Sequence, residues 1–321
     1  MKRTVLILMF AMMAMVYSQA QQIAVVTGNS TTLCQTLKEA INAARNGSVI
    51  YLPAGGFQIG TDSIDRKVTI IGVGHKANSN NADGNTVISG ELCFNQGSSG
   101  SAVMGCYISG DVKIGYDGNS VNNIVVKYCN FNSMQVNNNQ CTGTVVNQNY
   151  IRNGSAFRGA PGLFTNNVAH SINDLDGGKL LNNIVTSGQY NYYEGTRPFI
   201  FCDNCTIANN ILLNYAGCGA SCIVSGNMCR NGEWGDDPIN IGDVDWNDVF
   251  SDYNSGTITP ASIFHFSDAY SEYEGRVGIY AGSSFSDSAM PPVPYISFKS
   301  IPEQTDNDGK LKIKIRVKAS E

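Results

Sequence analysis

The chain has 321 residues, of which 42% are hydrophobic and 15% charged, and its formal net charge is −5. This apolar content excludes a disordered chain, and 34 glycines with many Asn, Ser and Thr favour a turn-dense all-β protein over a helical bundle. An acidic chain has no general electrostatic attraction to nucleic acid, so we do not expect nucleic acid as a partner.

Residues 1–20 have the features of a secretory signal peptide. Lys2 and Arg3 precede a continuous apolar run from Val5 to Val16, and Ser18-Gln19-Ala20 is a small-residue cleavage site. The run is too short to span a bilayer comfortably, and no later stretch is long and apolar enough. We expect a secreted, periplasmic or cell-surface protein with no transmembrane span after signal removal. A retained anchor helix is the alternative.

A short amphipathic helix is expected near the start of the mature chain. Apolar residues recur there at helical spacing, at Cys34, Leu37, Ile41 and Ala44. A hydroxyl of Thr31 or Thr32 is available to cap its start, and Gly47 to end it. Such a helix would cover the open end of a repetitive β-structure and shield its core.

One short phrase recurs between Asn123 and Arg230: a few apolar or small residues, then Asn, then an apolar residue. Its Asn residues are Asn130, Asn149, Asn167, Asn183, Asn210 and Asn227, at spacings of 19, 18, 16, 27 and 17. A period of roughly 20 residues is typical of a solenoid. The units are too rich in Asn, Gly and β-branched residues for helices. We predict a coil of short parallel strands, with Asn at tight turns and Asn side chains hydrogen-bonded along the stack.

Two stretches after the helix carry a family resemblance. Val49–Phe57 reads VIYLPAGGF and Lys67–Gly74 reads KVTIIGVG. With the preceding helix, they resemble the first coils of right-handed parallel β-helix proteins of the pectate-lyase-like superfamily, of the secreted bacterial type. The resemblance implies an all-β fold, a right-handed parallel β-helix (solenoid) over residues 21–288 with an N-terminal capping helix. This fold hosts lyases, hydrolases and adhesins, so it does not define an activity.

Residues 289–321 are predicted to form a C-terminal β-hairpin. A boundary at Pro291–Pro294 precedes Tyr295–Ile301, a polar turn through Asp306–Gly309, and Leu311–Lys318, in which apolar and cationic residues alternate strictly. We expect the apolar face of the hairpin to dock on the solenoid. The alternatives are an attachment or sorting strand, and a basic face that contacts an acidic polymer.

The segment before the fourth repeat is the first candidate site. Superfamily enzymes that cleave polyuronates by β-elimination use carboxylates that hold Ca²⁺, a Lys or Arg base and a further cation. The resemblance makes Asp174 and Asp176 candidate Ca²⁺ ligands and Lys179, Arg197 and Glu194 candidate catalytic residues, since the last two lie one coil later. The segment also has the sequence of an ordinary turn between coils, which is the simpler interpretation.

An aromatic insertion is the second candidate site. The repeat from Asn183 to Asn210 is longer than the others by roughly eight to ten residues, and insertions in solenoids often form the binding face. Aromatic rings stack on sugar rings. The candidate substrate-binding residues are Tyr190, Tyr192, Tyr193, Trp234 and Trp246. Packing over the flank of the solenoid is the alternative.

The ten cysteines all follow the signal peptide. An even number in an exported chain permits disulfides. Cys106 and Cys129 are expected at equivalent places on successive coils. Two pairs have a spacing similar to that of zinc ligands: Cys202 with Cys205, and Cys218 with Cys222. A local disulfide or stacked buried thiols are the competing interpretations.

The motifs of the best-known enzymes of this fold are absent. The chain has neither the Gly-His-Gly and Arg-x-Lys elements of polygalacturonases nor the Asp-His and Arg-x-Pro-x-x-Arg motifs of many pectate lyases. We therefore expect an exported, monomeric protein that binds polysaccharide. Cleavage is left open, either by a polysaccharide lyase or by a glycoside hydrolase, which would need paired acids such as Asp236, Asp237 or Asp203. A lyase would act on a uronate-containing glycan. The alternative is a non-catalytic surface adhesin or structural rod.

Overall fold

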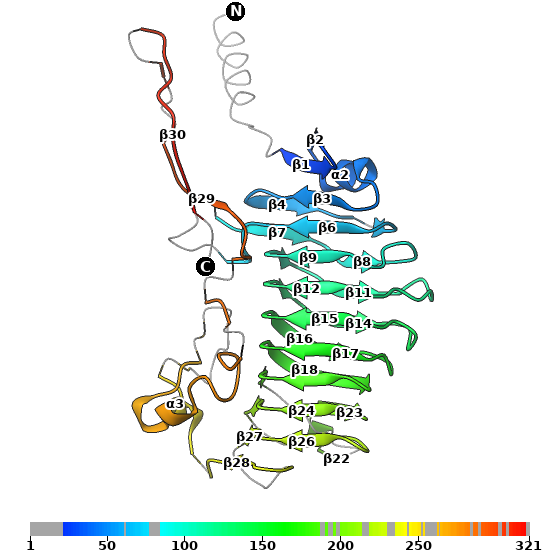
Figure 1. Ribbon diagram of the computed structural model, residues 1–321, viewed down its shortest axis with the longest axis vertical. Helices are drawn as coiled ribbons and strands as arrows, with labels where there is room; N and C mark the ends of the chain where they lie inside the picture. Colours follow the sequence, from blue (N-terminus) through cyan, green and yellow to red (C-terminus); the bar gives the residue numbers. More distant parts are fainter. Residues whose placement is uncertain are drawn as a thin grey trace, which may run out of the picture.

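The computed structural model describes residues 22–60, 62–76, 84–186, 190–191, 195–196, 200–213, 218–229, 235–242, 244–251, 253, 262, 264–282, 285–287, 290–300, 304–305 and 308–318. In these residues the protein is all-β, with two long and mostly parallel sheets and a few short helices (Figure 1). The predicted signal peptide lies outside this part of the chain. None of the helices described has the length and apolar character that crossing a membrane requires.

The first long sheet, sheet A, has eleven strands that follow one another in nearly sequential order. Strand β1 pairs antiparallel with β2 and β3, and from β3 onward each neighbouring pair is parallel. The strands are β2 (Ser30–Cys34), β1 (Ile23–Thr27), β3 (Ser48–Tyr51), β6 (Val68–Ile71), β9 (Ala102–Met104), β12 (Val125–Lys127), β15 (Thr144–Asn147), β17 (Gly162–Thr165), β19 (Lys179–Leu181), β24 (Thr206–Ala208) and β26 (Ile223–Ser225).

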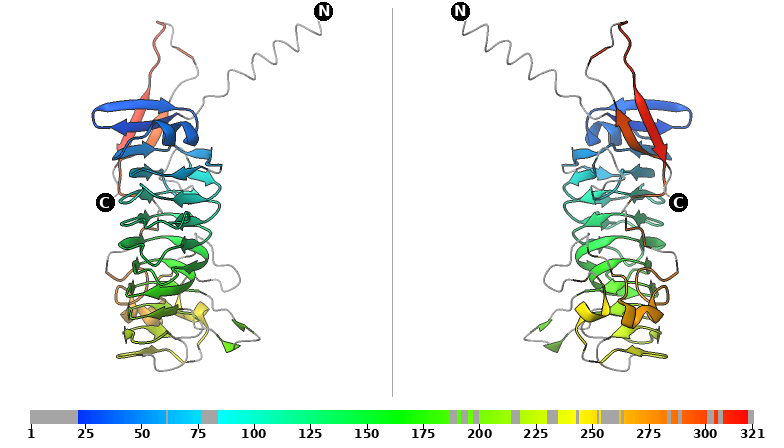
Figure 2. Two further views of the ribbon diagram at one scale, coloured as in Figure 1. Left: turned by 90° about the vertical axis from the view of Figure 1, so that its right-hand side faces the viewer. Right: turned by 90° about the vertical axis from the view of Figure 1, so that its left-hand side faces the viewer.

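The second long sheet, sheet B, has fifteen strands in a main path and a side branch. The main path comprises β4 (Gly55–Gln58), β7 (Thr86–Ser89), β10 (Tyr107–Ile108), β13 (Asn130–Phe131), β16 (Tyr150–Ala156), β18 (Val168–Asp176), β20 (Ile184–Val185), β25 (Ile211–Leu212), β27 (Met228–Cys229) and β28 (Ile239–Asn240). The branch comprises β5 (Ser63–Ile64), β8 (Leu92–Phe94), β11 (Val112–Ile114), β14 (Met134–Val136) and β23 (Ile200–Asp203). The chain passes through sheet A and then sheet B, over and over, and we call each such round a passage. Each passage adds one strand to sheet A and one or two strands to sheet B (Figures 1 and 2).

The core consists of apolar side chains stacked in register between the two sheets. In sheet A one fully buried column contains Ile50, Ile70, Val103, Val126, Val146, Phe164, Leu180 and Ile207. Because side chains alternate across a strand, the residues beside this column point outward. The predicted inward-facing apolar rungs are therefore confirmed.

A ladder of buried asparagines lines one corner of the core. Asn149, Asn167, Asn183, Asn210 and Asn227 are fully buried, and each Nδ2 donates to the next Oδ1 at 2.9–3.0 Å. The predicted Asn stack is confirmed over these five positions.

Two details of the predicted stack are wrong. Asn130 is not a member, because Cys129 occupies this place and donates its backbone N–H to Asn149 Oδ1 at 2.9 Å. The tight turn falls one residue earlier than predicted: Gln148 and Asn166, which precede ladder residues, have φ values of 55° and 53°. The left-handed conformation thus belongs to the residue before each Asn, whose side chain is left to bond along the stack.

Helix α2 (Leu37–Ala43) lies at the N-terminal end of the stack. Thr36 caps it by accepting the N–H of Glu39 at 3.2 Å, and Glu39 accepts the N–H of Gln35 at 3.0 Å. This reciprocal pair satisfies N–H groups at the start of the helix, which therefore begins later than the predicted Cys34. The cap expected from Thr31 or Thr32 is not used, because both lie in β2.

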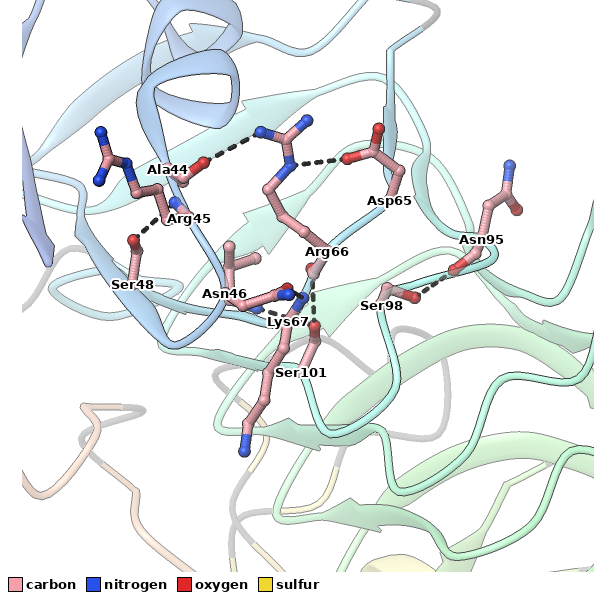
Figure 3. A network of polar contacts seen from close by, with 11 residues as sticks. Ala44, Arg45, Asn46, Ser48, Asp65, Arg66, Lys67, Asn95, Ser98 and Ser101 are labelled. Carbon is pink, nitrogen blue, oxygen red and sulfur yellow. Dashed lines mark hydrogen bonds and ion pairs between the residues drawn. The ribbon is translucent and has the colours of Figure 1, made fainter.

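A polar network joins the end of α2 to the next passage of the chain (Figure 3). Arg66 donates through Nη1 to the carbonyl of Ala44 at 3.0 Å and through Nε to Asp65 at 2.7 Å. The Arg66 hydrogen bond lowers the pKa of the Asp65 carboxyl. Ser101 Oγ accepts the N–H of Val68 at 3.0 Å. These bonds tie the helix to the second and third passages.

A second apolar cluster covers part of the outer face of sheet B. It includes helix α3 (Trp246–Val249) and lies beside the 3₁₀-helix η1 (Asp268–Tyr273). This segment, yellow to orange, lies along the lower part of the stack (Figures 1 and 2). Trp246 is only 4% exposed and donates through Nε1 to the carbonyl of Leu213 at 2.6 Å. Of the two interpretations given for Trp246, the structure supports packing over the flank, because the ring is buried in this cluster.

The predicted C-terminal hairpin is present as β29 (Tyr295–Ser300) paired antiparallel with β30 (Lys314–Lys318). Its predicted docking on the solenoid is wrong for β30, since Ile315 and Val317 are 56% and 61% exposed. The hairpin extends past the N-terminal end of the stack (Figure 1). The hairpin could not dock on the lower outer face of sheet B, because the Trp246 cluster already covers that surface.

Candidate functional site

Four polar or charged side chains from successive passages meet around a hollow of about 310 Å³, which we call the carboxylate hollow. The hollow lies where β16, β18 and β23 end. Its lining residues are Arg158, Gly159, Asp174, Leu175, Asp176, Cys202 and Asp203.

Asp174 reaches the hollow because the strand pairing slips at this residue. Between β18 and β23, Asn173 pairs with Phe201 and Leu175 pairs with Cys202, so Asp174 is an extra residue on its strand. Its φ of 57° is left-handed, a conformation that Asp tolerates better than most residues. Bulges of this kind redirect a side chain, and they are common beside functional sites.

Asp176 and Asp203 lie opposite each other on neighbouring parallel strands. Like charges in this relationship are destabilising, so each carboxylate needs hydrogen-bond donors. Asn204 Nδ2 donates to Asp176 Oδ1 at 2.8 Å, and the backbone N–H of Ala220 donates to Asp203 Oδ1. Neither second oxygen accepts a hydrogen bond from a residue that the structure describes.

The Asp203 carboxylate lies so close to the backbone at position 219 that only glycine fits there. A Cβ added to Gly219 would lie 2.2 Å from Asp203 Oδ1 and 2.6 Å from the carbonyl oxygen of Cys202. The backbone of the next passage therefore approaches Asp203 more closely than any other residue type would allow.

Among the lining residues that the structure describes, Arg158 supplies the single cation. It follows β16 in a left-handed conformation, with φ of 47°, and the next residue, Gly159, donates its N–H to the carbonyl of Asp174 at 2.6 Å. Three carboxylates and one guanidinium give the lining a net negative charge. This arrangement can accept hydrogen bonds from hydroxyl or ammonium groups and donate from Arg158.

The structure brings together part of the predicted site. Asp174 and Asp176 line the same hollow, whereas Lys179 begins β19 in sheet A and is exposed outside the lining. Tyr190 lies in β21 (Tyr190–Asn191), which pairs antiparallel with β22 (Gly195–Thr196). The remaining predicted site residues lie outside the described part of the chain: Tyr192, Tyr193, Glu194, Arg197 and Trp234.

Two lining residues were not assigned to this site from the sequence. The sequence suggested Asp203 only as one acid of a hydrolase pair, and nothing in the sequence pattern singled out Arg158. Arg158 could have been found from its position in the repeat. Arg158 and Gly159 come just after β16, at the corner where Asp174 lies one passage later, and the Gly159 N–H bonds to the Asp174 carbonyl. An alignment of the C-terminal ends of β16 and β18 in the sequence would have placed Arg158 beside Asp174.

The residues do not fit a preformed metal centre. Within the described residues, no group of three or more His, Cys, Asp or Glu side chains is arranged to hold a metal ion. The described residues therefore give no support to the Ca²⁺ site predicted at Asp174 and Asp176. They also give none to a zinc site at the Cys202–Cys205 and Cys218–Cys222 pairs.

Another polar group, on the outer face of sheet B, is internally satisfied. Lys113 Nζ donates to Glu91 at 2.6 Å, and this bond raises the pKa of Lys113. Asp111 accepts hydrogen bonds from Asn132 at 2.7 Å and Gln135 at 2.9 Å. These side chains bond to one another, so the carboxylate hollow is the better candidate for a ligand.

Comparison of the chain with known proteins gave no matching family model, no matching curated protein and no matching solved structure.

Proposed function

We propose that this chain is an exported, right-handed parallel β-helix protein, with the architecture of the pectate-lyase-like superfamily, that binds polysaccharide at the carboxylate hollow. Support for the coiled architecture is that parallel strands join both sheets in chain order, once per passage. Support for the ligand class is the convergence of Asp174, Asp176, Asp203 and Arg158 on one hollow.

The proposed binding chemistry follows from those four side chains. Free carboxylate oxygens accept hydrogen bonds from sugar hydroxyls, and charge-assisted bonds of this kind are roughly twice as strong as neutral ones. Arg158 donates to hydroxyl or ring oxygens. At about 310 Å³, the hollow is near the lower limit of small-molecule sites, so it accommodates one or two sugar units of a longer chain.

The charge of the lining favours a neutral sugar or an amino sugar over a uronate. A uronate carboxylate would face three carboxylates and one guanidinium, and like charges at close range disfavour binding. Cleavage is not part of the proposal, because Lys179 lies outside the lining and the described residues hold no group of three ligands that would support metal-assisted β-elimination.

A polysaccharide panel tests this proposal. Neutral, amino-sugar and uronate polymers are each offered to the full mature chain, with Ca²⁺ and with a chelator, while binding and product release are followed. We expect binding to a neutral or amino-sugar polymer that is insensitive to the chelator, without release of products. Failure to bind any polymer would refute the proposal. Release of unsaturated sugar products would also refute it and would show that the protein is a lyase.

A surface rod or adhesin is the second candidate function, and the hairpin supports it. In β30 the cationic Lys314, Arg316 and Lys318 alternate with exposed Ile315 and Val317. An exposed amphipathic strand of this kind is suited to a partner outside the chain. Deleting residues 295–321 should abolish attachment to the cell surface and leave polysaccharide binding unchanged if this second function applies.

A further inference from the structure

The C-terminal hairpin leaves both faces of strand β30 exposed. β29 and β30 form a sheet of their own, and Ile315 and Val317 on one face of β30 are more than half exposed. Because side chains alternate across a strand, Lys314, Arg316 and Lys318 lie on the opposite face, and they are exposed as well. An isolated two-stranded hairpin is only marginally stable in water, so a partner that covers it would stabilise it.

The same alternation extends to the residues just before β30. Lys310 and Lys312 are exposed, and so are Leu311 and Ile313. Residues 310–318, which we call the amphipathic segment, therefore contain five cations, four exposed aliphatic side chains and no acid. Exposed apolar side chains gathered in this way are typical of an interaction site.

The charge of the amphipathic segment is opposite to that of the rest of the chain. Residues 21–294 contain 13 Lys and Arg against 22 Asp and Glu, which gives a formal charge of −9. The hairpin extends past the N-terminal end of the stack, so a flat surface can meet the segment before it meets the acidic stack (Figures 1 and 2). The segment is therefore complementary to an anionic surface.

An anionic lipid surface is the occupant that accounts for both faces of β30. Amphipathic helices rich in Lys and Arg bind such surfaces through buried apolar area and attraction to anionic lipids, and neither contribution requires a helix. The long stems of Lys and Arg let their charged ends bend back to the headgroups. An anionic polysaccharide would contact the cations and leave Ile315 and Val317 in water, whereas an apolar protein surface would leave the cations without a partner.

We propose that the amphipathic segment binds the surface of an anionic lipid membrane and holds the N-terminal end of the stack beside it. Ile315 and Val317 supply apolar contact, and the five cations supply attraction to the lipid phosphates. Lipid binding of this kind does not involve the carboxylate hollow. It gives the surface rod or adhesin function a partner of stated chemistry.

The backbone of the hairpin limits how deep it lies. The sheet has two strands, so each has an outer edge whose N–H and C=O groups have no strand partner among the described residues. Unpaired backbone groups are excluded from the hydrocarbon core, because no water is there to bind them. The hairpin therefore lies at the level of the headgroups, with Ile315 and Val317 toward the acyl chains.

Co-sedimentation of the full mature chain with lipid vesicles tests this binding. The vesicles consist of phosphatidylcholine alone or of phosphatidylcholine mixed with phosphatidylglycerol. We expect the chain to sediment much more strongly with the anionic vesicles than with the neutral ones, because the cations contribute only to the former. Added salt should weaken this binding without abolishing it, since salt screens the charges and leaves the apolar contact.

Removal of three cations from the segment should weaken binding to the anionic vesicles by roughly 100-fold. The variant combines Lys312→Gln, Lys314→Gln and Lys318→Gln, and each cation near an anionic surface contributes about fivefold. The apolar face is unchanged in this variant, so any binding that remains should resist salt.

Two further variants complete the test. Ile315→Ser with Val317→Ser keeps every cation and should remove the part of the binding that salt does not weaken. Lys38→Gln with Lys67→Gln and Lys179→Gln is the matched control, because it removes three exposed cations from the stack, and it should bind like the wild type. All of these positions are exposed, so thermal unfolding should show that each variant is folded.

Four results would overturn the proposal. They are no binding to anionic vesicles, wild-type affinity in the variant without Lys312, Lys314 and Lys318, an equal loss of affinity in the matched control, or binding of the segment to an anionic polysaccharide in place of the vesicles. No sugar is present in the vesicle assay, so its outcome is separate from that of the polysaccharide panel.

Discussion

Asn183 Nδ2 donates a hydrogen bond to Asn210 Oδ1 at 2.9 Å, although the two residues are 27 positions apart. The preceding step of the ladder, from Asn167 to Asn183, spans 16 positions and has nearly the same length, 3.0 Å. The geometry of the ladder is therefore independent of the length of chain between its steps. Extra residues are accommodated outside the stack, and the buried corner continues without interruption.

Removing one step of the ladder should be costly. Asn183 Oδ1 accepts from the backbone N–H and from one side-chain N–H of Asn167, so Asn183→Ala removes the acceptor of two buried N–H groups, while Asn167 Nδ2 keeps its bond to the Val146 carbonyl. We expect the free energy of unfolding to fall by about 2–4 kcal/mol, measured by urea denaturation. The control is Asn153→Ala, which removes an exposed side chain and should cost less than about 0.5 kcal/mol. Equal effects of the two changes would show that the ladder does not stabilise the stack.

Trp246→Ala should act on stability and not on sugar binding. The ring is buried in the cluster on sheet B and is stacked against Phe250 at a centroid distance of 5.6 Å. Loss of a buried Trp costs roughly 3–5 kcal/mol, which thermal unfolding will detect. Affinity for polysaccharide, measured well below the melting temperature, should be unchanged. If a folded Trp246→Ala variant lost its affinity for polysaccharide, Trp246 would have a role in sugar binding after all.

The free energy of unfolding should decrease as the pH falls, because His75 is buried in its neutral form. Burial lowers the pKa of His75 to about 3, and neither ring nitrogen has a hydrogen-bond partner among the described residues. The unfolded state, with a pKa near 6.5, binds a proton first. The contribution is therefore complete above about pH 6.5 and is lost at up to about 1.4 kcal/mol per pH unit toward pH 3.

Urea titrations between pH 4 and pH 8 check this dependence. The slope of unfolding free energy against pH should be shallower in His75→Leu than in the wild type. Carboxylates contribute equally to both proteins, so the difference in slope isolates His75. Parallel slopes would contradict this, because they would mean that His75 binds its proton equally well in the folded and the unfolded chain.

The local patterns of the sequence predicted the stack well, and the long-range contacts less so. The alternation around Ile70 and Val103 predicts which side chains are buried, because strand periodicity alone decides it. Cys129 and Asn130 show the limit of this reasoning. Adjacent residues of similar size can exchange places in the ladder, and only the left-handed turn before Cys129 decides which of them points inward.

The candidate site shows the same limit. Asp174 and Asp176 stood out in the sequence as a turn with two acids, whereas Asp203 and Arg158 join them only because strands from different passages end at one corner. The slip in pairing at Asp174 has no sequence signature of its own. The sequence could not decide between sugar stacking and flank packing for Trp246, because its partners, such as Leu213, lie far away in the chain.

The most direct test of the account is a calorimetric titration of the polysaccharide selected by the panel against variants of the hollow. Asp174→Asn and Asp203→Asn lie on different passages, and each replaces a charged acceptor by a neutral one; Asn at position 203 can still accept the Ala220 N–H. Each should weaken binding by roughly 10- to 100-fold, as expected for a lost charge-assisted hydrogen bond. Glu272→Gln, an exposed acid outside the lining, should bind like the wild type. Wild-type affinity in both Asp variants would contradict the assignment of the carboxylate hollow as the binding site.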